Sequence, residues 1–104
     1  MSLSRALLKG EARTAMLARV AGWAEVEGRD AICREYKFKD FQTAFFDFMT
    51  PVGKKAEELN HHPEWFNVYN TVKVTLATHD AGGVTEYDIS LAEFMDKTAE
   101  GLPK

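Results

Sequence analysis

Three histidines are the side chains of this chain best suited to acid–base chemistry, and they lie close together in the sequence. His61 and His62 are adjacent, and His79 follows a later apolar run. Imidazole has an unperturbed pKa of about 6.5, so it can both donate and accept a proton near neutral pH. A single histidine is more often a cap or a hydrogen-bonded core residue. The clustering predicts a site in which several imidazoles perform general acid–base catalysis.

The adjacent pair lies on a segment with restricted backbone freedom. In Asn60-His61-His62-Pro63, the proline fixes its own φ angle and disfavours a helical conformation for the residue before it. The preceding helix is therefore predicted to end here, with both imidazoles on a stiff loop. In the strand predicted next, Trp65 either lines the same pocket as the histidines or fills the core.

Other chemistries fit these residues less well. Three histidines and a water molecule can bind zinc, but adjacent histidines beside a proline converge poorly on one tetrahedral ion, and the spacing H-E-x-x-H does not occur. Cys33 lacks the local sequence of a thiol nucleophile, and the chain has neither G-x-S-x-G nor a glycine-rich phosphate loop. These absences favour a reaction that needs no metal and no cofactor.

Hydrophobic periodicity and turn residues predict the elements that must position the histidines. Apolar residues at intervals of about three or four indicate helices, and alternating residues joined by short polar loops indicate two hairpins. Gly22 is expected to end the first helix in a left-handed conformation, and Thr85 with Asp88 resembles a capping box. The predicted helices cover residues 11–20, 40–59 and from 86 onward, and the predicted strands cover 23–26, 31–38, 65–69 and 72–78.

The order of these elements is α-β-β-α-β-β-α. Strands joined as hairpins favour an antiparallel sheet with helices on one face. The sequence therefore predicts an α+β two-layer sandwich, in which a four-stranded antiparallel sheet carries three helices on one face. With 104 residues, the chain is expected to form a single domain over residues 1–104.

The long helix predicted after residue 40 contains a proline. Asp40 is its candidate N-cap, whereas Pro51 lacks a backbone N–H and costs about 3 kcal/mol inside a regular helix. Two solutions are open. Either the helix kinks at Pro51, or it breaks so that Thr50 caps a second segment with Pro51 as its first residue.

Composition and charge restrict the class of protein. The chain has 13 basic and 16 acidic residues, and its net charge of -3 argues against binding of a nucleic-acid backbone. A single cysteine excludes an intramolecular disulfide, and no segment is apolar enough for a signal-peptide core or a membrane span. We therefore expect a cytoplasmic protein without direct contacts to nucleic acid or membrane, whose small core gains stability from self-association.

Several motifs of the chain resemble the signature of the pterin-4a-carbinolamine dehydratases. The histidine doublet is followed by proline, glutamate and tryptophan, a further histidine comes after the next hairpin, and an aspartate follows that histidine. The resemblance extends from residue 22 to about residue 94. It is carried by Gly22-Trp23, the segments 27–32 and 38–41, Glu57, His61-His62-Pro63, the segment 65–69, Thr78-His79 and Asp88.

The resemblance implies a fold and a reaction. The family has a four-stranded antiparallel sheet with three helices on one face. Its enzymes remove water from the 4a-hydroxytetrahydropterin released by aromatic amino-acid hydroxylases and give a quinonoid dihydropterin, without a metal or redox cofactor. A proton must reach the leaving oxygen and another must leave ring nitrogen N5, so several histidines suit the reaction.

The resemblance also implies site residues. The catalytic residues are His61, His62 and His79, with His62 holding the ring and assisting proton removal and the other two serving as alternative acids. Glu57 would orient an imidazole and Asp88 would orient His79, or these two acids are a surface charge and a helix cap. The substrate-binding residues are Asn60, Pro63, Trp65, Ala77, Thr78 and Asp80.

Departures from the family pattern fall mainly in the long helix. Asn60 stands where many members carry an aspartate, which keeps a hydrogen-bonding side chain without its charge. Near Phe46-Asp47 the helix is longer than the family pattern by one residue, and Pro51 and Gly53 replace ordinary helix formers. Family members use this helix to pair dimers into tetramers. A kinked or split helix would argue against this tetramer, and a dimer built through sheet edges would remain possible.

Two functions of different class follow from these patterns. A dehydratase depends on the histidines. A non-catalytic interaction module depends on an exposed apolar face of the long helix. This second function resembles the family's role as dimerisation cofactor of a homeodomain transcription factor, and it would allow the protein to be present in the nucleus. Both functions can hold in one homo-oligomeric protein, as a dimer or a tetramer.

Overall fold

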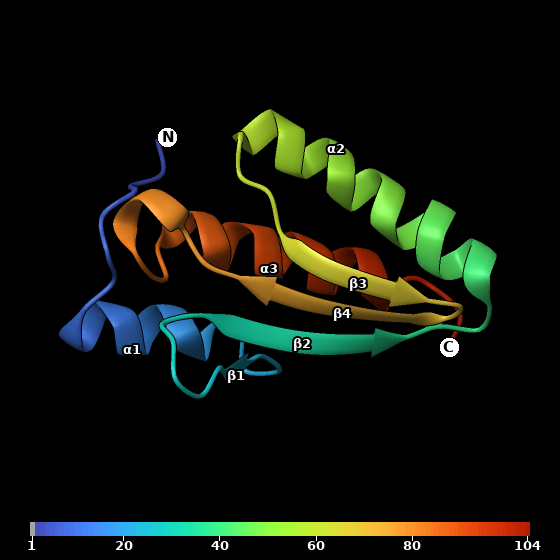
Figure 1. The fold of residues 1–104 in the computed structure, drawn as a ribbon, viewed down its shortest axis with the longest axis horizontal. Coiled ribbons are helices and arrows are strands. Elements are labelled where there is room, and N and C mark those ends of the chain that lie inside the picture. Colours follow the sequence, from blue (N-terminus) through green and yellow to red (C-terminus); the bar gives the residue numbers. More distant parts are fainter. Residues whose placement is uncertain (1) are drawn as a thin grey trace.

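Four strands form one antiparallel sheet in this computed structural model, which describes residues 2–104 (Figure 1). They are β1 (Ala24–Glu25), β2 (Ile32–Lys37), β3 (Glu64–Val68) and β4 (Thr71–Leu76), in the spatial order β1-β2-β4-β3. β2 and β4 therefore form the centre of the sheet, although the long helix separates them in the sequence. Both predicted hairpins are confirmed, and the strands differ from the predicted ranges only at their ends.

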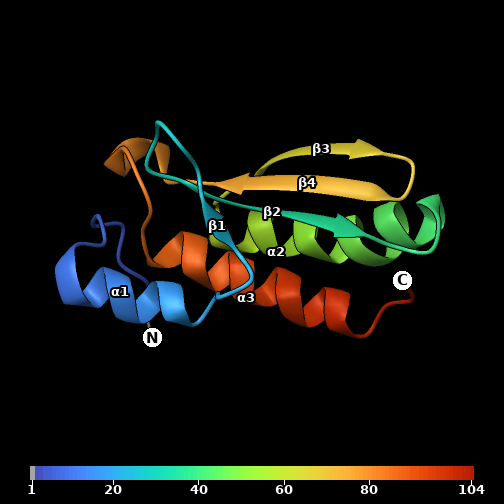
Figure 2. The ribbon, with the colours of Figure 1, turned by 90° about the horizontal axis from the view of Figure 1, so that it is seen from below.

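Alternation along β4 gives the sheet one buried face. Val72, Val74 and Leu76 are buried, whereas Lys73 is exposed, because successive side chains of a strand point to opposite faces. The helices α1 (Gly10–Ala18), α2 (Thr50–Leu59) and α3 (Glu86–Glu100) all lie on the same side of the sheet (Figure 2). The predicted α+β two-layer sandwich is confirmed.

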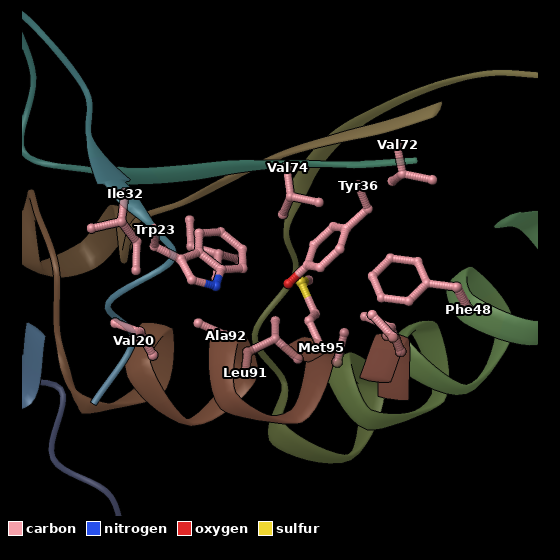
Figure 3. Close-up of a cluster of buried hydrophobic side chains, with 14 of the residues drawn as sticks. Val20, Trp23, Ile32, Tyr36, Phe48, Val72, Val74, Leu91, Ala92 and Met95 are labelled. Atoms are coloured by element: carbon pink, nitrogen blue, oxygen red, sulfur yellow. The ribbon is translucent and has the colours of Figure 1, made fainter. Parts of the chain in front are cut away.

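Trp23, Tyr36 and Phe48 lie among aliphatic side chains in the core between the sheet and the helices (Figure 3). The ring centroid of Tyr36 lies 4.7 Å from that of Phe48 and 6.2 Å from that of Trp23. Asp96 of α3 accepts hydrogen bonds from the Tyr36 hydroxyl and from Nε1 of Trp23. Burial and the nearby carboxylate both raise the pKa of Tyr36, so its hydroxyl stays protonated and donates.

Replacing Asp96 with alanine should lower the free energy of unfolding by about 2 to 3 kcal/mol, because two buried donors lose their acceptor. Urea denaturation measures this loss. Glu93→Ala on the same helix is the matched control, because Glu93 forms an exposed ion pair with Arg19 and should change stability by less than about 1 kcal/mol. Equal losses in the two variants would contradict the structural role given to Asp96.

Gly22 does not have the left-handed conformation predicted for it. The glycines with positive φ are Gly10, Gly28 and Gly82. A Cβ added at Gly22 would lie 2.3 Å from Nη1 of Arg34, which donates to Asp96. The absence of a side chain at Gly22 leaves room for this guanidinium group. Gly22 does not end α1, whose last residue is Ala18.

The long helix starts as predicted. Oδ1 of Asp40 accepts hydrogen bonds from the backbone N–H and the hydroxyl of Thr43, at 2.8 and 2.7 Å. These bonds hold the pKa of Asp40 below its usual value, as expected for a carboxylate that caps a helix. The helix then continues as η1 (Thr43–Met49), a π-helix that passes directly into α2.

The π-helix contains Phe46-Asp47, where the sequence analysis expects one residue more than the family pattern, and it ends just before Pro51. A π-turn holds about one residue more than an α-turn. The N–H of Thr50 bonds the carbonyl of Phe45, and the Thr50 hydroxyl donates to the same oxygen at 3.0 Å. Pro51 follows in the first turn of α2, where proline is tolerated. Of the two alternatives left open, the break with Thr50 as an N-cap is therefore wrong, because Thr50 keeps right-handed helical angles.

Candidate active site

The end of α2 holds the adjacent histidines in place. Asn60 has φ 50° and ψ 47°, in the left-handed region that asparagine tolerates better than most residues. The N–H of Asn60 bonds the Glu57 carbonyl at 3.1 Å, and the N–H of His61 bonds the Ala56 carbonyl at 2.9 Å. This pair of bonds is a Schellman motif, so the helix end itself fixes the backbone that carries His61.

His61 is buried against a carboxylate. It is only 6% exposed, and its Nε2 lies 2.6 Å from Oδ1 of Asp88, which is fully buried. Asp88 also accepts hydrogen bonds at 2.9 Å from the Thr78 hydroxyl and from the backbone N–H of Thr85. Because the carboxylate accepts, we assign a proton to Nε2 of His61, and Nδ1 remains for exchange with a bound molecule.

Asp88 therefore contacts a different histidine from the one predicted. The sequence pairs it with His79, whereas the structure pairs it with His61. The capping box explains the difference, because it turns the Asp88 carboxylate back over the first turn of α3, toward Thr85. His79 lies exposed in the short helix η2 (His79–Ala81). One side chain thus both caps α3 and holds an imidazole.

His62 is held on the solvent side of the site. Its Nε2 lies 2.7 Å from Oε1 of Glu57, and the two side chains are 59% and 80% exposed. An exposed pair of this kind contributes less than about 1 kcal/mol to stability. The bond to Glu57 orients the His62 ring. The structure thus places Glu57 beside an imidazole, as the sequence analysis expects.

All three histidines line one pocket. Its volume is about 390 Å³, and its lining comes from the segment after α2, the start of β3 and η2. α2 ends and β3 begins at the same end of the molecule (Figure 1). Imidazoles from two separate elements therefore face the same volume, an arrangement that suits proton transfer at two positions of one molecule. The predicted site residues in its lining are Asn60, His61, His62, Pro63, Ala77, Thr78, His79 and Asp80.

Trp65 is the predicted substrate-binding residue that this lining does not contain. β3 pairs Trp65 with Val74, whose side chain is buried, so both residues lie on the core face of the sheet. Trp65 is partly buried and packs against the hydrophobic core. The assignment of Trp65 to the pocket is therefore corrected, and its alternative as a core residue is favoured.

Glu64 lines the pocket although the sequence analysis assigned it no role. Its carboxylate accepts hydrogen bonds from two nitrogens of Arg29, at 2.9 and 2.8 Å. These bonds hold the pKa of Glu64 below its usual value, so Glu64 is ionised at neutral pH. Its place directly after Pro63, inside the recognised motif, is the signal that could have identified it.

Arg5 also lines the pocket and reaches it from the N-terminal segment. Leu8 of that segment is buried, and its N–H bonds the Val84 carbonyl at 3.0 Å. The Arg5 guanidinium carbon lies 4.0 Å from the centre of the Tyr87 ring, and Nη2 donates to the Asn60 carbonyl at 3.3 Å. No motif surrounds Arg5 in the sequence, so only the path of the folded chain reveals it.

The histidines of the site are not grouped with other potential metal ligands. Residues 2–104 contain no cluster of three or more histidine, cysteine, aspartate or glutamate side chains arranged to hold a metal ion. His61 and His62 instead contact one carboxylate each. Within the same described part of the chain, none of the helices is both long and apolar enough to cross a membrane.

The chain is similar to known proteins over most of its length. A family model described as pterin 4 alpha carbinolamine dehydratase matches residues 6–98. The chain belongs to this dehydratase family. A "Putative pterin-4-alpha-carbinolamine dehydratase" from Bradyrhizobium sp. (strain BTAi1 / ATCC BAA-1182) is 56% identical over 95 residues, which cover 91% of this chain and 95% of the relative. A protein of the same name from Burkholderia multivorans (strain ATCC 17616 / 249) is 59% identical over 92 residues, which cover 88% and 89%.

A solved structure has the fold seen here. The crystal structure of transcriptional coactivator/pterin dehydratase from Brucella Melitensis matches with a TM-score of 0.83 and 52% identity, covering 88% of this chain and 97% of that chain. The resemblance to the pterin dehydratase family is therefore confirmed in both sequence and fold. The family match begins at residue 6, so Arg5 lies just outside it.

Proposed function

We propose that this chain removes water from 4a-hydroxytetrahydropterin and gives a quinonoid dihydropterin. The observation that supports this most directly is that His61, His62 and His79 all line the same pocket. Family membership suggests the class of substrate, a pterin carbinolamine. The specific substrate we propose is the 4a-hydroxytetrahydrobiopterin released by aromatic amino-acid hydroxylases in the cytoplasm, whose dehydration allows the cofactor to be reduced and used again.

The reaction needs one proton donor and one proton acceptor. The bond between C4a and the hydroxyl oxygen breaks while that oxygen takes a proton, and it leaves as water. The lone pair of N5 forms a double bond to C4a, and the proton on N5 passes to a base. The acid and the base are restored by proton exchange, so the reaction consumes no oxidant or reductant.

The three histidines divide these roles in our proposal. His61 comes from the end of α2 and His79 from η2, so each acid approaches the pocket from a different element. The hydroxyl at C4a lies on one face or the other of the ring, and a different acid protonates it in each case. His62 holds the ring and takes the proton from N5, with its imidazole oriented by Glu57.

Absorbance measurements on chemically generated 4a-hydroxytetrahydropterin test the proposal. The wild-type protein should speed its breakdown over buffer, and His62→Ala should reduce that rate at least about tenfold, because general acid–base groups contribute a factor of about 10² to 10⁴. Glu58→Ala is the control on the same helix, because Glu58 pairs with Lys55 and lies outside the site. A wild-type rate equal to that of buffer would show that the proposal is wrong.

Self-association is the second part of the proposal. Phe41, Phe45 and Phe46 form an exposed aromatic cluster at the start of the long helix, with exposures of 43%, 39% and 57%. Exposed apolar clusters of this kind are typical of surfaces that contact another protein. The helix is continuous through the cluster, so it offers an uninterrupted face. We therefore propose a homo-oligomer, a dimer or a tetramer, that buries this aromatic cluster.

Replacing Phe46 with aspartate should lower the molar mass measured by light scattering, because the charge would be buried in the interface. Phe66→Asp is the matched variant on the exposed edge strand β3, where Phe66 is 61% exposed. It should leave the mass unchanged. Loss of assembly in Phe66→Asp alone would indicate that the interface lies at the sheet edge and not at the aromatic cluster. A monomeric wild-type protein would contradict self-association altogether.

A further inference from the structure

We propose that Arg5 is a substrate-binding residue of this site and donates hydrogen bonds to the carbonyl oxygen of the bound pterin ring. The proposal takes its ligand from the dehydratase function proposed above. Arg5 lies outside the matched residues 6–98, so the family match gives it no role. It nevertheless lines the same pocket as the three histidines.

The backbone on both sides of Arg5 is attached to the body of the protein. On one side, the N–H of Ser4 donates to Oε1 of Glu86 at 3.2 Å. On the other side, Leu8 is buried and its N–H bonds the Val84 carbonyl at 3.0 Å. The segment that carries Arg5 therefore follows the start of α3 past the pocket, and Arg5 is presented at a defined place.

The guanidinium group of Arg5 is held flat and keeps donors free. It stacks over Tyr87 at 4.0 Å, and the Tyr87 ring lies 5.6 Å from the ring of His61. A stacked guanidinium keeps the N–H groups at its edge available. Its bond to the Asn60 carbonyl is long, at 3.3 Å, and involves one of its two terminal nitrogens. The remaining donors can serve a molecule in the pocket.

The charges around the pocket indicate which part of a pterin Arg5 would bind. Glu64 and Asp80 also line it, and carboxylates suit the N3–H and 2-amino donors of the ring. Arg5 has only donors, so it suits the ring carbonyl, which is an acceptor. A cation does not favour departure of hydroxide from C4a, where positive charge develops. The bond to Arg5 should therefore strengthen binding without accelerating the chemical step.

A different role for Arg5 would act through the histidines. Its bond to the Asn60 carbonyl could clamp the loop that carries His61 and His62. A clamp of this kind would change kcat and its pH dependence, because it would move catalytic groups. A direct bond to the substrate would instead change KM and the binding of an unreactive pterin.

Kinetics and equilibrium binding of Arg5→Met and Arg5→Lys separate these roles. The binding ligand is 7,8-dihydropterin, which has no 4a hydroxyl to lose, and fluorescence reports its Kd. Arg5→Met should raise both KM and Kd at least about tenfold, with kcat within about twofold of wild type across the pH range. Arg5→Lys keeps the charge but lacks the planar guanidinium group, so its KM and Kd should lie between those of the wild-type protein and those of Arg5→Met. Arg19→Met, at an exposed ion pair with Glu93, should change nothing.

Two results would overturn the role of Arg5. One is an unchanged Kd and KM in Arg5→Met, with thermal melting confirming a folded protein. The other is an altered pH profile of kcat with an unchanged Kd, which would make Arg5 a clamp. If the wild-type protein has no dehydratase activity but Arg5→Met still weakens binding of 7,8-dihydropterin, the proposed function fails while Arg5 remains a pterin-binding residue.

Discussion

Removal of both His61 and His79 should slow dehydration of both 4a epimers, with kcat/KM reduced by about 10² to 10⁴. The two imidazoles reach the pocket from different elements, the end of α2 and η2. Each can therefore serve the hydroxyl on one face of the ring. His61→Ala alone should slow dehydration of mainly one epimer, and His79→Ala alone should slow dehydration of mainly the other.

A mixture of the two epimers gives the measurement, because each epimer decays in its own phase of the absorbance trace. The wild-type protein should accelerate both phases, and each single variant should leave a different phase slow. His62→Ala is the internal comparison, because a residue that holds the ring should slow both phases alike. If His61→Ala and His79→Ala slowed the same phase, the assignment of one acid to each face would be wrong.

Asp88→Asn should reduce turnover of the epimer that depends on His61 by about 100-fold or more, because it removes the buried negative charge that stabilises the His61 imidazolium. The Asp88 carboxylate accepts a hydrogen bond from Nε2 of His61 at 2.6 Å. With Nε2 bonded to residue 88, His61 gives a proton from Nδ1 only as an imidazolium, and the neutral amide of asparagine does not stabilise that cation. Stability should also fall, by about 1 to 3 kcal/mol, because the buried group would no longer satisfy all its donors.

Asp96→Asn is the matched control for Asp88→Asn. Both carboxylates lie on α3, and each accepts several hydrogen bonds, but Asp96 contacts Trp23 and Tyr36 in the core. Asp96→Asn should therefore lower stability in urea denaturation and leave dehydration unchanged. Equal loss of activity in both variants would mean that Asp88 acts through stability alone.

The fold could be predicted from the sequence because its signals are local. Val72, Val74 and Leu76 alternate with polar residues, which identifies β4 and its buried face. The Thr85 and Asp88 spacing identifies the start of α3, and the capping box is present. Such signals depend on residues close in the chain, and the structure agrees with them except at element ends.

The partners within the site could not be predicted in this way, because they depend on contacts between distant segments. Asp88 meets His61 only because α3 packs beside the end of α2. Arg5 reaches the pocket only because Leu8 is buried beside Val84. Trp65 is a different case, since its pairing with Val74 follows from the register of two predicted strands and could have indicated the core.

Because of the π-helix, a change in the length of the long helix need not change the geometry of the site. One residue added to a regular α-helix would rotate everything after it by about 100°. Val52 and Ala56 are buried, and such a rotation would turn both away from the core and carry His61 away from Asp88 of α3. The wider turn between Thr43 and Met49 can take up one such residue before α2 begins. The helical phase of α2 relative to the sheet is thereby preserved, so the first half of this helix can vary in length while the histidines keep their places.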